Sequence, residues 1–173
     1  MLSLLRKSEL IIIAGAVILI SGCNRTCRNT SIVWAAQVSD ATFADSWGTW
    51  KTNYGQLGSY LTRDQFKKLM NKQGPQDITI EEFLRLHVEN ERVNRYPDAK
   101  TAEEMYPPND RPRGDEDIAA VNYFLEACEP VSPIVVARVQ DGQSTRYIKL
   151  DGAHRLAAAA LKRSKIRVVF VDL

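Results

Sequence analysis

The chain has 173 residues, of which 45% are hydrophobic, 25% charged and 8% aromatic, and its formal net charge is +2. This length and composition indicate one globular domain with an appendage, and they exclude a disordered, collagen-like or repeat protein. The 23 basic residues are nearly balanced by 21 acidic ones. The strongly basic surface of a dedicated duplex-DNA-binding protein is therefore missing, and nucleic acid is not expected as the main partner.

The first 22 residues have the pattern of a secretory signal peptide. Arg6 and Lys7 precede an apolar run from Leu10 to Ile20. This run is shorter than the roughly 20 residues of a comfortable membrane span, but it is typical of the apolar region of a signal. The alternative is a short signal anchor that is not cleaved.

The residues around Cys23 indicate lipid attachment. Ile20-Ser21-Gly22 before Cys23 resembles the lipobox of bacterial lipoproteins, in which cleavage exposes a cysteine whose thiol carries a diacylglycerol. The resemblance implies a mature chain that starts at Cys23 and is tethered to membrane lipid through residues 23–31. Asn24 after the cysteine looks like the outer-membrane pattern. We therefore expect an exported, lipid-anchored protein, at the outer membrane if the cell is Gram-negative.

Export would also place the remaining thiols in an oxidising compartment. With Cys23 acylated, Cys27 and Cys128 are the cysteines free to pair, and a disulfide between them would pin the tether to the domain. The alternative is an exposed Cys27 and a Cys128 buried on the apolar face of a helix.

Residues 32–76 form an N-terminal extension. A helix is predicted over residues 62–73, because Thr62 can cap it and Gly74-Pro75 stops it. The extension carries all the tryptophans of the chain, which could form a ligand-stacking surface but are expected to pack the extension onto the main core. They are Trp34, Trp47 and Trp50.

Residues 77–173 are predicted to form an α+β domain with a small mixed sheet and packing helices. Residues 77–86 begin with the strand-like Ile78-Thr79-Ile80 and are predicted to move into a short helical turn. Residues 94–114 are rich in Pro, Asp and Arg, which predicts a long loop insertion without regular structure. Asp141-Gly142 predicts a hairpin turn. The pattern predicts a helix over residues 115–128 and two strands over residues 134–139 and 145–150. A second helix over residues 153–163 and a closing strand over residues 166–171 follow.

The most informative stretch is KLDGAHRLAAAA, residues 149–160, where a strand runs into a helix. Gly152 lets the backbone turn tightly, and the unpaired amides of the first helical turn attract an anion. Arg155 can donate a fork of hydrogen bonds to a phosphate, while His154 can donate one more or move a proton. Together with Asp151, these residues outline a candidate phosphate pocket.

A simpler interpretation gives the same residues structural roles. Asp151 would cap the helix and pair with Arg155 four residues later, and His154 would bond a local carbonyl. Residue types alone favour this interpretation, since many strand-glycine-helix junctions share them.

The wider pattern around the turn favours the functional interpretation. SPIVVARV (residues 132–139) followed by RYIKLDGAHRLAAAALKRSKIRVVFVDL (residues 146–173) resembles the ParB/sulfiredoxin-like superfamily. The preceding helix, residues 115–128, matches as well, and ITIEEF at residues 78–83 resembles the opening strand. The resemblance covers residues 77–173 and implies the family's α+β fold, with the insertion at 94–114 as a departure.

The resemblance implies that the turn binds the phosphates of a nucleotide, since sulfiredoxins use it for ATP and ParB proteins use its equivalent for CTP. Mg²⁺ would arrive with the nucleotide. Gly152, His154 and Arg155 fall on the phosphate-binding positions of the family. Ala153 replaces the catalytic cysteine of sulfiredoxins, which excludes reduction of a sulfinic acid by that route. ParB-type partitioning is not expected either, because its helix-turn-helix and dimerisation domains do not follow the closing strand.

A third branch of the superfamily, the free-serine kinases, has a similar Asp-Gly-His-His-Arg turn and a carboxylate base near its first strand. Glu89 or Glu91 could fill that catalytic role here, as could Glu81 or Glu82. The alternative is that these glutamates form the solvated face of a charged helix.

Two classes of function follow from these patterns. The first is a membrane-tethered domain that binds a phosphorylated small molecule at residues 152–155, as a phosphotransferase or nuclease-like hydrolase. The second is a non-catalytic binding or scaffold lipoprotein with a vestigial pocket. No metal site of the protein's own is expected, since the chain has two histidines and no metal-binding motif.

Overall fold

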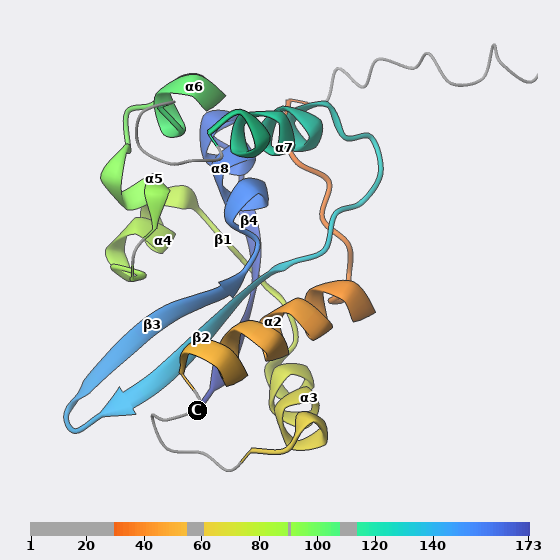
Figure 1. The fold of residues 1–173 in the computed structure, drawn as a ribbon, viewed down its shortest axis with the longest axis vertical. Helices are drawn as coiled ribbons and strands as arrows, with labels where there is room; N and C mark the ends of the chain where they lie inside the picture. The colour runs from red at the N-terminus through yellow and green to blue at the C-terminus, as the bar shows by residue number, and fades with distance from the viewer. Residues whose placement is uncertain (1–29, 55–60, 90, 108–113) are drawn as a thin grey trace, which may run out of the picture.

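The computed structural model describes residues 30–54, 61–89, 91–107 and 114–173. It contains a four-stranded sheet with the strand order β1-β4-β2-β3, in which β4 and β2 are parallel and the two outer pairs are antiparallel. The predicted α+β class with a small mixed sheet is confirmed (Figure 1). The described elements are α2 (Asp40–Asn53), α3 (Arg63–Gln73), β1 (Gln76–Ile78), α4 (Ile80–Arg85), α5 (Arg92–Arg95), α6 (Ala102–Met105), α7 (Gly114–Glu126), β2 (Ile134–Asp141), β3 (Ser144–Asp151), α8 (Ala153–Leu161) and β4 (Ile166–Asp172).

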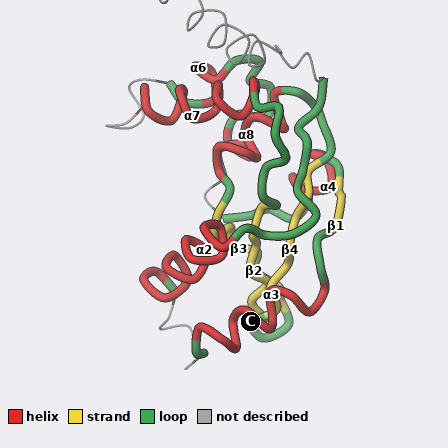
Figure 2. Tube along the Cα trace, turned by 90° about the vertical axis from the view of Figure 1, so that its right-hand side faces the viewer, coloured by secondary structure: helices red, strands yellow, loops and turns green. Residues whose placement is uncertain are grey.

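Helices cover both faces of the sheet. Along β2, Ile134 and Val136 point into a core shared with α8, whereas Val135 and Ala137 point into a second core shared with α2 and α3. Because both faces are buried, the central strands are almost continuously apolar, as is usual for covered strands. In both views α6, α7 and α8 gather at one end of the molecule, while α2 and α3 lie towards the other (Figures 1 and 2).

The hairpin between β2 and β3 forms where the sequence predicts it. Gly142 has a φ of +61° at the first position of a two-residue loop, which is the backbone conformation that glycine adopts most readily. The ladder extends beyond the predicted strands, from Asp141 paired with Ser144 to Val135 paired with Asp151. This strand pair leads directly into the turn before α8.

The N-terminal extension supplies the layer that covers the second face of the sheet. Trp50 is buried in the core formed by α2, α3 and the sheet, and Trp47 packs against Phe66 with ring centroids 5.5 Å apart. Trp34 packs on the opposite core, and its Nε1 donates to the carbonyl of Lys165. The expectation that the tryptophans serve packing is confirmed.

Local capping explains where several elements depart from prediction. Thr62 caps α3 as expected, but Thr79 ends β1 because its side chain caps α4 in a reciprocal box with Glu82. The backbone N–H of Thr79 donates to that carboxylate, which holds the pKa of Glu82 below its usual value. The stretch predicted as strand-like at residues 78–80 is therefore mostly a helix start, and the short helical turn predicted after it is present as α4.

The prediction of a loop without regular structure at residues 94–114 is wrong in its described part. It contains α6, which Thr101 caps by accepting a hydrogen bond from the Glu104 backbone, and α5 overlaps its start. The helix predicted to reach Cys128 ends at Glu126. Cys128 follows it and is exposed, so the expectation of a buried cysteine on a helix face is also wrong.

Candidate functional site

The turn between β3 and α8 is built around Gly152. Its φ is +101°, and a Cβ added there would lie 3.2 Å from the Ile134 Cα and 3.1 Å from the Ile134 Cγ1. Both the backbone conformation and the contact with β2 therefore require glycine. Gly152 is also the N-cap of α8 and has no side-chain cap, so the first turn of the helix opens directly beside the sheet.

Arg155 stabilises this turn from inside the protein. Its side chain is only 9% exposed, and its Nη2 lies 2.6 Å from Asp151 Oδ2. Its Nη1 donates to the carbonyl of Ser132 at 2.9 Å and to the hydroxyl of Thr42 at 3.1 Å. The ion pair between Asp151 and Arg155 is therefore present, as the simpler interpretation of the sequence predicts. Asp151 does not cap the helix, however, because its Oδ1 accepts from the Gly152 N–H instead.

His154 has a partner that the sequence did not indicate. Its Nε2 lies 2.8 Å from Oδ1 of Asp117 on α7, and its ring packs against Tyr106 with centroids 5.7 Å apart. The expectation of a hydrogen bond to a local carbonyl is thus wrong. Asp117 holds the imidazole from outside the turn, while 35% of the His154 side chain stays exposed. In the described part of the chain, no hydrogen bond engages its Nδ1.

A pocket of about 270 Å³ opens over the turn. Thr42 and Asp45 of α2, Phe124 of α7 and residues 151–155 line it. The first α8 amide that bonds within the helix is that of Leu156, which donates to the Gly152 carbonyl. The preceding amides of residues 153–155 have no acceptor within the described residues. The structure thus brings all four predicted pocket residues together around donors that can hold an anion.

The two predicted catalytic glutamates lie elsewhere, along the outer edge of β3. The backbone N–H of Glu89 donates to the Tyr147 carbonyl, and its carboxylate pairs with Arg146 at 2.7 Å and 3.2 Å. This hydrogen-bonded pair raises the pKa of Arg146. Glu91 forms an ion pair with Lys149, and its side chain is only 3% exposed. Neither glutamate lines the pocket over the turn, and the prediction of a solvated helical face does not describe the buried Glu91.

A chain of ring contacts runs from Arg92, the residue after Glu91, to His154. The neighbouring Arg92 is buried and lies over the Tyr106 ring at 5.0 Å from its centroid. Tyr106 in turn packs against His154. The sequence offered no signal for Tyr106 or Asp117 as site residues, since both come from elements far from the turn in the chain.

The structure describes one of the three cysteines of the chain. Cys23 and Cys27 lie outside the described residues, whereas Cys128 is disulfide-bonded.

Among the described helices, none is long and apolar enough to cross a membrane. Within the same residues, no group of three or more His, Cys, Asp or Glu side chains is placed to hold a metal ion.

Comparisons with protein-family models, curated proteins and solved structures found no match to this chain. The resemblance to the ParB/sulfiredoxin-like superfamily therefore rests on the residues of the turn and on the order of the elements around it.

Proposed function

We propose that the protein binds a phosphorylated small molecule at the start of α8, as a domain tethered to a membrane through an acylated Cys23. The observation that carries the proposal is the position of His154. It is held by Asp117 beside the open amides of residues 153–155, in a pocket that no described side chain fills. A phosphoryl group would accept hydrogen bonds from these amides and from the imidazole.

Electrostatics support an anion at this position. Amides at a helix N-terminus carry partial positive charge, and the dipole of α8 adds to it. The buried Arg155 contributes a full positive charge behind the turn, although Asp151 offsets much of it. Arg155 is thus a positioning residue, because it holds Asp151, Ser132 and Thr42 around the turn and need not touch the ligand.

His154 gives the site the means to move a proton. An imidazole held at one nitrogen by a carboxylate keeps the other nitrogen available as an acid or base. In this pocket that arrangement suits phosphoryl transfer or hydrolysis of a phosphodiester. If the ligand is ATP or CTP, the carboxylate of Asp45 offers an oxygen to the accompanying Mg²⁺.

One observation favours a second candidate, a non-catalytic binding or scaffold lipoprotein. The groups that a transferase of this type would use as base and phosphate clamp are engaged in ion pairs with other parts of the chain. Glu89 pairs with Arg146, Glu91 with Lys149, and Arg155 with Asp151. Binding without turnover would fit this arrangement.

The test is calorimetric titration of the full chain, kept in detergent, with ATP, ADP and CTP in the presence of Mg²⁺. His154→Asn is expected to weaken binding by about tenfold or more, because one charge-assisted donor is lost. His87→Asn is the matched control, since His87 is exposed and does not line the pocket. Its φ of +50° is one that asparagine tolerates.

The outcomes separate the two candidates. Binding that depends on His154, followed by release of phosphate or transfer to an acceptor, supports an enzyme. Binding without turnover supports the scaffold protein. A folded wild-type chain that binds none of the nucleotides contradicts nucleotide binding, and the same titration with inorganic phosphate then tests the anion site itself.

A further inference from the structure

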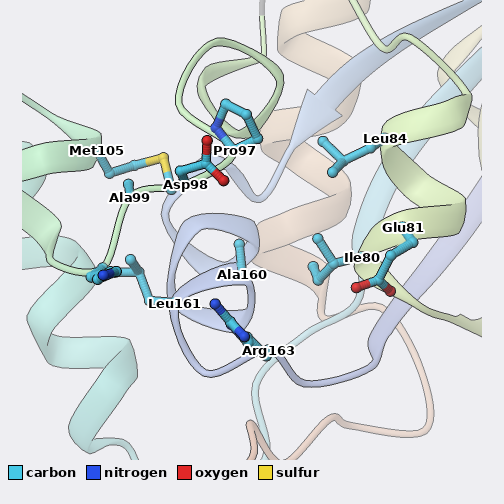
Figure 3. Close-up of a pocket in the computed structure, with 11 residues that line it drawn as sticks. Ile80, Glu81, Leu84, Pro97, Asp98, Ala99, Met105, Ala160, Leu161 and Arg163 are labelled. Atoms are coloured by element: carbon cyan, nitrogen blue, oxygen red, sulfur yellow. The ribbon is translucent and has the colours of Figure 1, made fainter.

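A second pocket lies at the opposite end of α8 from the phosphate-binding turn. It has a volume of about 270 Å³ and is bounded by α4, residues 97–100, α6 and the end of α8. Figure 3 shows Ala160 near its centre, with Ile80 and Leu84 on one side and Met105 on the other. These side chains give the pocket an apolar floor. Small-molecule sites measure roughly 300 to 1,000 Å³, so this pocket lies just below that range and suits only a small ligand.

Charged side chains of both signs surround the apolar floor. Glu81 and Asp98 are acidic, and Lys100 and Arg163 are basic. In Figure 3 the carboxylates of Glu81 and Asp98 and the guanidinium of Arg163 point toward the space beside Ala160. Within the described residues none of the four charged side chains forms a salt bridge. The rim of the pocket therefore offers carboxylates to a cationic group of a ligand and basic side chains to an anionic group.

Arg163 reaches this rim through an uncommon backbone conformation. Its φ is +48°, and its N–H donates to the Ala160 carbonyl in the turn that ends α8. Glycine is the usual residue at such a position, because a Cβ is strained there. Arg163→Gly therefore removes the guanidinium without weakening the fold, which makes it a sharp test of any role in binding.

We propose that this pocket binds a free α-amino acid with an apolar side chain. The ligand carboxylate would pair with Arg163 and Lys100, and a guanidinium can hold a carboxylate through two parallel hydrogen bonds. The ligand ammonium would face Glu81 and Asp98. The ligand side chain would cover the apolar floor. A zwitterion with an apolar group matches all three features of the pocket at once, whereas a simple anion or cation would leave two of the rim charges unused.

The probe is L-leucine, titrated calorimetrically into the full chain. Saturable binding is expected, and Arg163→Gly should weaken it by about tenfold or more while leaving the thermal unfolding midpoint unchanged or higher. Glu81→Gln should also weaken binding. Glu103→Gln is the matched control, because Glu103 is exposed on α6 and does not line the pocket, so it should bind leucine as the wild type does.

Three analogues test which parts of the ligand are recognised. Isocaproate lacks the ammonium, isoamylamine lacks the carboxylate, and glycine lacks the side chain. Each is expected to bind about tenfold more weakly than leucine, or worse. The proposal is overturned if leucine shows no saturable binding to the wild type. It is also overturned if Arg163→Gly retains wild-type affinity, or if isocaproate or isoamylamine binds as tightly as leucine.

Discussion

Arg155 on α8 and Asp151 at the end of β3 form an ion pair in which Nη2 and Oδ2 lie 2.6 Å apart. The guanidinium also donates to the carbonyl of Ser132, just before β2. One side chain thus connects α8 with the ends of two strands. The arginine that the motif assigns to a phosphate has its described hydrogen bonds within the protein. Among the charged side chains of the motif, this leaves His154, through its Nδ1, to meet a ligand.

Replacement of Arg155 should therefore lower stability as well as binding. Arg155→Met is expected to reduce the free energy of unfolding by about 3 kcal/mol, because the variant leaves the partly buried Asp151 without its counter-charge. Urea denaturation measures the loss. The matched control is Arg138→Met in the more exposed pair with Asp172, where the loss should stay below about 1 kcal/mol. Equal losses in the two variants would contradict the role of Arg155 in holding the turn.

Gly152 should tolerate a side chain much less well than Gly142. Both have positive φ, so alanine strains the backbone at either position, at a cost of about 1 to 2 kcal/mol. At Gly152 the new Cβ would also crowd Ile134, whereas nothing lies within 4 Å of it at Gly142. Gly152→Ala is expected to cost about 1 to 3 kcal/mol more than Gly142→Ala. Thermal unfolding of the two variants side by side provides the comparison, and similar midpoints would argue against the tight packing of the turn.

The pair between Asp77 on β1 and Arg167 on β4 should make stability depend on pH. Hydrogen bonds from Arg167 hold the pKa of Asp77 below its usual value of 3.8. A carboxyl with a lowered folded-state pKa stabilises the fold above its unfolded pKa, and this contribution disappears as the pH falls through the folded value. Both side chains are partly exposed, so Asp77→Asn should cost less than about 1 kcal/mol.

Denaturation of Asp77→Asn and wild type near neutral pH and again well below the aspartate pKa measures this contribution. The difference in unfolding free energy should be present at neutral pH and absent in acid. A difference that is the same in both conditions would show that the variant acts through something other than the carboxylate charge.

Cys128 is disulfide-bonded, and the identity of its partner tests the proposed anchor. If Cys23 carries a lipid on its sulfur, that thiol is consumed, and the partner of Cys128 should be Cys27. Mass spectrometry of a non-reduced digest of the membrane-extracted protein is expected to show a peptide pair joined through Cys27 and Cys128. A pair joined through Cys23 would contradict acylation of that cysteine, and a reduced digest serves as the control.

Local sequence signals predicted much of the fold. The cap at Thr62, the Asp-Gly turn before β3 and the apolar runs of β2 and β4 are each encoded within a few residues, so the order of elements from α7 to β4 could be inferred. The signal for α4 was also present, because Thr79 and Glu82 have the spacing of a capping box. A short helical turn was predicted there, but the strand-like Ile78-Thr79-Ile80 pattern placed its start too late.

The partners of the site residues could not be predicted in this way. His154 meets Asp117 across 37 positions of the chain, and Lys149 meets Glu91 across 58. Such pairs depend on how α7 and the segment before α5 pack against the sheet and α8, which no local pattern encodes. The sequence thus located the turn itself but not the side chains that orient it.

The open amides at the start of α8 are expected to bind a phosphoryl group. The most direct measurement is a titration of the isotope-labelled full chain, in detergent micelles, with MgATP and then with inorganic phosphate, followed by the backbone amide resonances. The largest shifts are expected on the amides of Ala153, His154 and Arg155, and His154→Asn should reduce them at equal ligand concentration. Unchanged resonances at these three amides, or shifts concentrated elsewhere in the protein, would contradict it.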